Sequence, residues 1–187
     1  MNKLLLSLAA AVMICFAACA QKKGNSEMKQ SKTLVAYFSA TGTTAQKART
    51  IAQITGGDLF AITPETAYTN ADLDWTDKQS RSSVEMNDPN ARPALKEQKA
   101  DLQKYDVVFI GYPIWWDLAP RIINTFVESH DLKGKTLILF ATSGGSGIDN
   151  SVKELKKTYP DLTWQEGKLL NHTSENEIKE WIESVLN

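Results

Sequence analysis

The stretch LVAYFSATGTT, residues 34–44, decides the fold of this chain. Its first five residues form a continuous apolar run, which is typical of a strand that is buried on both faces. The following residues, 43–55, place apolar side chains at helical spacing and end before the pair Gly56-Gly57. We therefore predict a buried strand, a short polar loop and then a helix.

The same alternation continues toward the C-terminus. Apolar runs predict further strands at 59–62, 107–111, 137–141 and, with a weaker signal, 162–165. Apolar residues at helical spacing predict helices over 118–127, 148–155 and 174–186, the last of which starts with the capping box Ser174–Glu177. Strands that alternate with helices indicate an α/β fold with an open, doubly wound parallel sheet.

The N-terminus has a different character from the rest of the chain. Lys3 is followed by 15 uncharged, apolar residues, 4–18, which are too few to span a bilayer comfortably and indicate a cleaved signal peptide over 1–18. Residues 16–19, FAAC, resemble the lipobox of bacterial lipoproteins, which predicts lipid on Cys19. An ordinary signal peptidase site with Cys19 unmodified is the alternative.

A polar segment, 19–31, follows and is expected to act as a flexible tether for a folded body over 32–187. We therefore expect an exported protein that is held by its lipid alone on the periplasmic or surface side of a bacterial membrane. Both cysteines, Cys15 and Cys19, lie before the body, which excludes a disulfide, a thiolate nucleophile or a cysteine metal site there. A formal net charge of −1 over 187 residues gives no electrostatic case for nucleic acid.

Ligands of doubly wound sheets bind at the carboxyl ends of the strands, so the loops after the strands are the places to examine. The first such loop, 39–44, places four hydroxyl groups and Gly42 at a helix N-terminus, where free N–H groups favour a phosphate. It contains no lysine or arginine, which excludes the P-loop of nucleotide hydrolases. Helix capping by Thr41 or Thr43 is the alternative role of these hydroxyls.

Two other loops complete the pattern. In YPIWWD, 112–117, two adjacent tryptophans are difficult to bury together and costly to leave bare, so we expect them to cover a flat ligand. In TSGGSG, 142–147, glycines let the backbone approach a ligand closely, although a generic connection is an alternative. A phosphate at one end and a flat ring at the other match flavin mononucleotide (FMN).

With these three loops, residues 32–187 resemble the flavodoxin family, whose phosphate loop reads T/S-x-T-G-x-T after the first strand. The resemblance implies a five-stranded sheet in the order 2-1-3-4-5, FMN as cofactor, and chemistry that takes place on the flavin without a catalytic side chain. It implies phosphate contacts from Ser39, Thr41, Gly42, Thr43 and Thr44; ring contacts from Pro113, Ile114, Trp115 and Trp116; and contacts to the polar edge of the ring from Thr142, Ser143, Gly144 and Gly145.

The body departs from this family in two ways. It is near neutral, where flavodoxins are strongly acidic, so electrostatic steering toward a protein partner is expected to be weak. The aromatic loop also has no glycine between Pro113 and Pro120, which disfavours the peptide flip that accompanies one-electron reduction. We therefore expect two-electron chemistry, from NAD(P)H to a quinone-like acceptor. A carrier that serves a redox partner protein, and a lipid-anchored binding module without redox activity, are the alternatives.

Residues 64–104 are too many for a plain connection and predict an insertion in which NARPAL, 90–95, leads into a helix. The insertion is expected either to lie near the ring or to be a solvated excursion unrelated to the ligand. Asp117 and Asp149 are expected either to cap helices or to lower the potential of a nearby ring. His130 and His172 have no partner nearby in the sequence, so we expect surface or capping roles for them.

Overall fold

The computed structural model describes residues 32–96 and 101–186. The predicted signal peptide, Cys19 and the tether lie outside these residues. The strands are β1 (Thr33–Tyr37), β2 (Asp58–Ala61), β3 (Val107–Pro113), β4 (Thr136–Thr142), β5 (Thr163–Trp164) and β6 (Lys168–Leu169). The helices are α1 (Thr43–Thr55), α2 (Arg81–Asn87), α3 (Arg121–Ser129), α4 (Asp149–Thr158) and α5 (Glu175–Leu186). None of these helices is long and apolar enough to cross a membrane.

The strands form one parallel sheet in the order β2-β1-β3-β4-β5, which confirms the predicted doubly wound α/β fold. At its centre, Val35 of β1 is in register with Leu59 of β2 and Phe109 of β3. The outer position next to β4 is shared by two short strands, because β5 pairs with the start of β4 and β6 with its end. Strand β6 was not predicted, since two residues are too few to show a periodic pattern.

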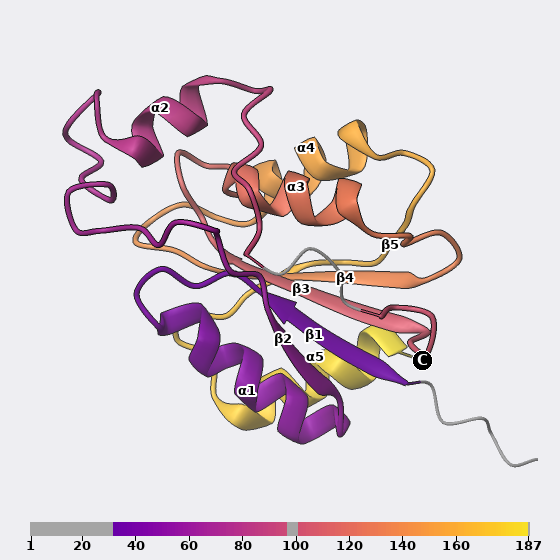
Figure 1. The fold of residues 1–187 in the computed structure, drawn as a ribbon. Coiled ribbons are helices and arrows are strands. Elements are labelled where there is room, and N and C mark those ends of the chain that lie inside the picture. Colours follow the sequence, from indigo (N-terminus) through magenta and orange to yellow (C-terminus); the bar gives the residue numbers. More distant parts are fainter. Residues whose placement is uncertain (1–31, 97–100, 187) are drawn as a thin grey trace, which may run out of the picture. The chain divides into compact units, whose positions relative to one another are not determined.

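Helices cover both faces of the sheet, α1 and α5 on one side and α3 and α4 on the other (Figure 1). Alternate residues of β1 enter the two cores: Val35 packs with α1 and α5, whereas Leu34 and Ala36 belong to the other cluster. Strands β3 and β4 are almost wholly buried in the same way. This burial on both faces explains why the sequence of each strand is an unbroken apolar run.

Most helix boundaries follow local signals in the sequence. Helix α1 has the predicted bounds and ends at Gly56, whose φ of 65° is easily adopted by glycine. The capping box of α5 is present, with Ser174 and Glu177 exchanging hydrogen bonds. Helix α3 begins only after Pro120, because the residue before a proline is disfavoured in helical conformation. In α5 the helical spacing places Leu186 on the buried face with Ile178 and Ile182, and this expectation was wrong, since Leu186 is 42% exposed.

The predicted insertion runs between β2 and β3 and contains α2 (Figure 1). Its one helix among the described residues lies before NARPAL, and the predicted helix after NARPAL falls on residues 97–100, which lie outside the described residues. Leu95 forms an antiparallel bridge with Pro64, which closes the base of the excursion. Helix α2 has only seven residues and begins at Ser80, whose side chain accepts a hydrogen bond from the N–H of Ser83.

One glycine in the sheet has a steric role that gives a direct test of this packing. Gly111 of β3 is in register with Phe140 of β4, and a Cβ atom at Gly111 would overlap the Phe140 ring. We predict that Gly111→Ala lowers the free energy of unfolding by about 1–3 kcal/mol, measured by chemical denaturation. Gly144→Ala is the control, because its added Cβ has no neighbour within 4 Å. Equal stability of the two variants would contradict the described packing.

Candidate functional site

The loops after β1, β3 and β4 meet at the carboxyl edge of the sheet. The N–H of Ile114, in the second loop, donates to the carbonyl oxygen of Thr142 at 2.8 Å. The hydroxyl of Thr142 in turn shares a hydrogen bond of 2.8 Å with the hydroxyl of Thr44, in the first loop. The structure therefore brings together the three segments that the sequence indicated.

The first loop leaves the N-terminus of α1 open. Gly42 has a φ of 94°, and its N–H donates to the hydroxyl oxygen of Ser39 at 3.1 Å. No side chain caps α1, so the alternative role of Thr41 and Thr43 as helix caps was wrong. Both threonines are exposed, and the first N–H groups of α1 face the same region. The helix dipole adds positive potential there, which favours an anion.

Thr44 differs from the other hydroxyl residues of this loop. It is 1% exposed, and its hydroxyl is engaged with Thr142 rather than directed to solvent. The Thr44 hydroxyl is therefore already paired within the protein. The side chain of Thr44 serves to tie α1 to the end of β4.

The second loop separates the two tryptophans. Trp115 packs edge-on against Phe38, with ring centroids 5.5 Å apart, and against Tyr68 at 5.3 Å. Trp116 lies outside this cluster and is 45% exposed. Only one of the two indoles is therefore held by core packing, as expected for adjacent residues that cannot share a core.

The turn that carries Trp116 is strained. Trp115 and Leu118 exchange backbone hydrogen bonds of 3.0 Å in both directions, which closes a two-residue turn. Its central residues, Trp116 and Asp117, have φ angles of 46° and 66°, as in hairpin turns that usually contain glycine or asparagine. Asp117 does not cap the following helix, because α3 has no side-chain cap. Its backbone is in the left-handed conformation, which costs non-glycine residues free energy.

The aromatic cluster also fixes the excursion to the site. Tyr68 contacts Phe38 and Trp115 and donates its hydroxyl hydrogen bond to Glu85 of α2. The Arg81 guanidinium lies 4.1 Å from the centre of the Tyr68 ring and donates to Glu85 at 2.7 Å. Burial, together with the neighbouring Glu85 carboxylate, raises the pKa of Tyr68, so its hydroxyl stays a neutral donor.

The third loop is held by a residue that the sequence analysis missed. The side-chain amide of Asn171 accepts from the N–H of Ser143 at 2.7 Å and donates to the Ser143 carbonyl oxygen. The backbone of Ser143 is thus already paired, and the N–H of Gly145 donates to the Ser143 hydroxyl oxygen at 3.1 Å. The exposed backbone of Gly144 is therefore the part of this loop that best suits a ligand contact.

A cavity of about 440 Å³ lies between these loops. Thr41, Ile114, Trp115 and Gly144 line it, together with other residues of the same loops. Leu73, Trp75 and Ser82 line it from the excursion. The insertion therefore borders the predicted ring site. This supports the expectation that it lies near the ring and is not a solvated excursion unrelated to the ligand.

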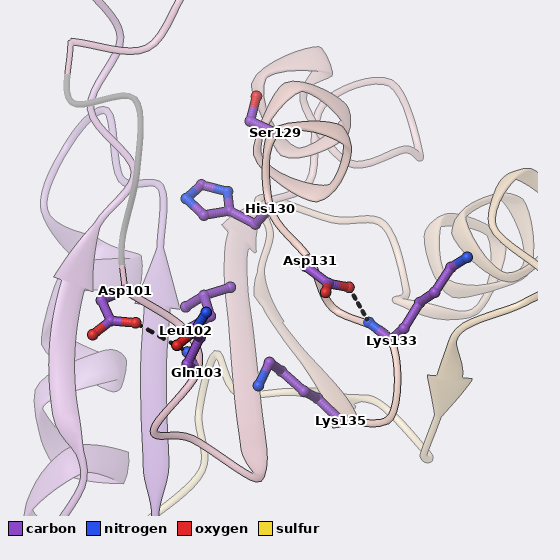
Figure 2. A pocket seen from close by; sticks show the side chains of 8 residues that line it. All are labelled: Asp101, Leu102, Gln103, Ser129, His130, Asp131, Lys133 and Lys135. Atoms are coloured by element: carbon purple, nitrogen blue, oxygen red, sulfur yellow. Dashed lines mark hydrogen bonds between the residues drawn. The ribbon is translucent and has the colours of Figure 1, made fainter.

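A second cavity, of about 520 Å³, lies near the amino ends of β3 and β4 (Figure 2). Its lining is highly charged and contains none of the predicted site residues. The carboxylates of Asp101 and Asp131 accept backbone hydrogen bonds from Gln103 and Lys133, both at 3.2 Å. Because doubly wound sheets bind ligands at the opposite edge, the first cavity is the candidate functional site.

The fold and the three converging loops define a flavodoxin-like protein. The family model described as Flavodoxin matches residues 32–185, and the chain belongs to this family. No curated protein matches the chain.

Solved structures of similar proteins agree with this assignment. A candidate flavoprotein from Bacteroides eggerthii is 64% identical, with a TM-score of 0.82, over 84% of this chain and 99% of that chain. Another from Bacteroides uniformis is 57% identical, with a TM-score of 0.80, over 82% and 98%. A flavoprotein from Lactobacillus acidophilus, solved in complex with FMN, shares the fold at 20% identity, with a TM-score of 0.64, over 81% and 99%.

The strained turn predicts the effect of one substitution. Asp117→Gly should raise the free energy of unfolding by about 0.5–1 kcal/mol, because glycine adopts a positive φ without steric cost. Asp161→Gly is the control, since positive φ among the described non-glycine residues is confined to Trp116 and Asp117. The control should lower stability by about the same amount through backbone entropy. Thermal or urea denaturation measures both, and destabilisation by Asp117→Gly would contradict the description of the turn.

Proposed function

We propose that this chain is an FMN-binding electron-transfer protein, with the cofactor held across the carboxyl ends of β1, β3 and β4. The observation that carries the proposal is the open N-terminus of α1 beside an uncharged cavity. The phosphate of FMN would bind at the N-terminus of α1, and its ring would lie in the cavity between the three loops. The flavodoxin family and the FMN complex of the Lactobacillus acidophilus protein support the same cofactor.

The phosphate would bind at the start of α1. Thr41 and Thr43 offer exposed hydroxyls there, and the backbone N–H groups of the first turn are uncapped by side chains. Hydrogen bonds from hydroxyl and N–H groups to a phosphate oxygen are charge-assisted and so stronger than neutral ones. No cationic side chain is needed, because the helix dipole favours the anion.

The ring would lie in the cavity beside Trp115. The contacts of Trp115 with Phe38 and Tyr68 fix the orientation of its indole, so little side-chain freedom remains to be lost on binding. Gly144 adds space on the opposite loop, because a Cβ there would meet nothing within 4 Å. The residues present therefore fit a flat, largely apolar ring system.

Bound FMN supplies the electron transfer, and the residues of this chain bind it, orient it and limit the access of water. Within the described residues, no ionisable side chain lines the cavity. Proton transfer to a substrate is therefore not assigned to any side chain of the site.

Within this function we propose two-electron transfer from NAD(P)H to a quinone-like acceptor, with one-electron exchange with a protein partner as the alternative. The Trp115–Leu118 turn supports this choice, because a flip of its central peptide would give a type II′ turn, whose first central position favours glycine, whereas this chain has Trp116 there. Stopped-flow spectra of the flavin during reduction by NAD(P)H test the proposal: a stable one-electron-reduced form would contradict it.

The phosphate assignment is tested by two exposed hydroxyls. We predict that Thr41→Val with Thr43→Val raises the dissociation constant for FMN by about 100-fold or more, since two hydrogen bonds to a charged group are lost and each is worth about 1.5–3 kcal/mol. Riboflavin, which lacks the phosphate, should bind wild type and variant equally in the same absorbance titration. Thr158→Val, at an exposed site on α4, is the control protein. Equal losses for FMN and riboflavin would contradict the assignment, and a folded wild type that ignores FMN would favour a binding module.

We also propose that the body is exported and held at a bacterial membrane by lipid on Cys19, which lies outside the described residues. The support is the short apolar segment before a cysteine in the sequence. In cells labelled with a radioactive fatty acid, the full chain should carry the label and Cys19→Ser should lose it. Label retained in Cys19→Ser would contradict this proposal and leave the fold and the FMN site unaffected.

A further inference from the structure

Trp75 is the most exposed large hydrophobic residue of the candidate site. It is 74% exposed, yet it lines the cavity together with Leu73 and Ser82 of the same excursion. A large exposed indole at the mouth of a cavity offers a ring on which a planar ligand can stack. Trp75 belongs to none of the three loops that are assigned to FMN, so it is available to a second molecule.

The backbone around Trp75 is held in place by its neighbours. The Asp74 carboxylate accepts from the N–H of Thr76 at 3.0 Å and from the Thr76 hydroxyl at 2.6 Å. The Asp74 carbonyl oxygen accepts from the N–H of Asp77 at 3.2 Å. A bond of 2.9 Å from the N–H of Ser82 to the Asp72 carbonyl oxygen joins this turn to α2. The indole is thus presented on an ordered turn, which lowers the entropy cost of binding a ligand.

The lining of the cavity indicates the chemistry of that second molecule. Within the described residues it contains apolar, aromatic and small hydroxyl side chains and no charged ones. Arg81 adjoins Ser82 in sequence, but it is engaged with Glu85 and with the Thr66 carbonyl oxygen at 2.7 Å. A neutral planar ring that stacks on the indole suits such an uncharged lining.

We propose that Trp75 and Leu73 form the outer wall of a binding position for a neutral, planar quinone, stacked over the predicted flavin. The inference rests on the proposed function and assigns the binding of its acceptor to two residues of the excursion. The quinone would take two electrons and two protons in all, from the reduced flavin and solvent, and leave as the hydroquinone. The flavin, reduced beforehand by NAD(P)H, returns to its oxidised form.

The test measures binding rather than turnover. Oxidised, FMN-loaded protein does not react with oxidised 1,4-naphthoquinone, so calorimetric titration gives the dissociation constant directly. Trp75→Ala should weaken naphthoquinone binding about tenfold, in line with the loss of one aromatic stacking partner, while the FMN dissociation constant stays unchanged. Trp75→Phe should recover most of the affinity. Val84→Ala is the matched control, because Val84 is 51% exposed on the same excursion but does not line the cavity.

Two outcomes would overturn the inference. Unchanged naphthoquinone affinity in Trp75→Ala would show that the indole is not part of a quinone position. A parallel loss of FMN affinity would show that Trp75 contacts the flavin itself. Both outcomes leave the proposed function standing, whereas a wild-type protein that takes up no FMN fails at the first titration and overturns both proposals.

Discussion

Thr142, the last residue of β4, makes the contacts on which the candidate site depends. It is 4% exposed; its carbonyl oxygen accepts from Ile114, and its hydroxyl is bonded to that of Thr44, both at 2.8 Å. A buried polar group that loses its partner costs about 1–3 kcal/mol, so each of these groups holds the others in place. These hydrogen bonds therefore couple the loops after β1, β3 and β4. The cavity between the loops is formed by this arrangement without a bound ligand.

The excursion between β2 and β3 extends this coupling outward. Tyr68 joins it to Phe38 and Trp115 through ring contacts, and its hydroxyl hydrogen bond to Glu85 ties the start of the excursion to α2. One cluster thus orients the Trp115 indole, which lines the cavity, and also anchors the segment that carries Trp75. Under the proposed function, flavin binding and access to the outer side of the cavity would depend on the same few aromatic contacts.

The sequence predicted those features that depend on local or topological signals. The long strands were visible because burial on both faces demands unbroken apolar runs, and the bounds of α1 followed from its periodicity and Gly56. The site loops followed from their position after strands. By contrast, the role of Asn171 depends on β6 placing it beside Ser143, and the direction of the Thr44 hydroxyl depends on packing against β4. Such tertiary contacts leave no periodic pattern in the sequence.

The most direct measurement is a crystal structure of the protein grown with FMN. The account predicts the phosphate within hydrogen-bond distance of the first N–H groups of α1 and the ring between Trp115 and Gly144. It also predicts that the Thr142 contacts to Ile114 and Thr44 persist, because the loops already have their binding arrangement. A flavin bound elsewhere, or crystals without flavin at saturating FMN, would contradict it.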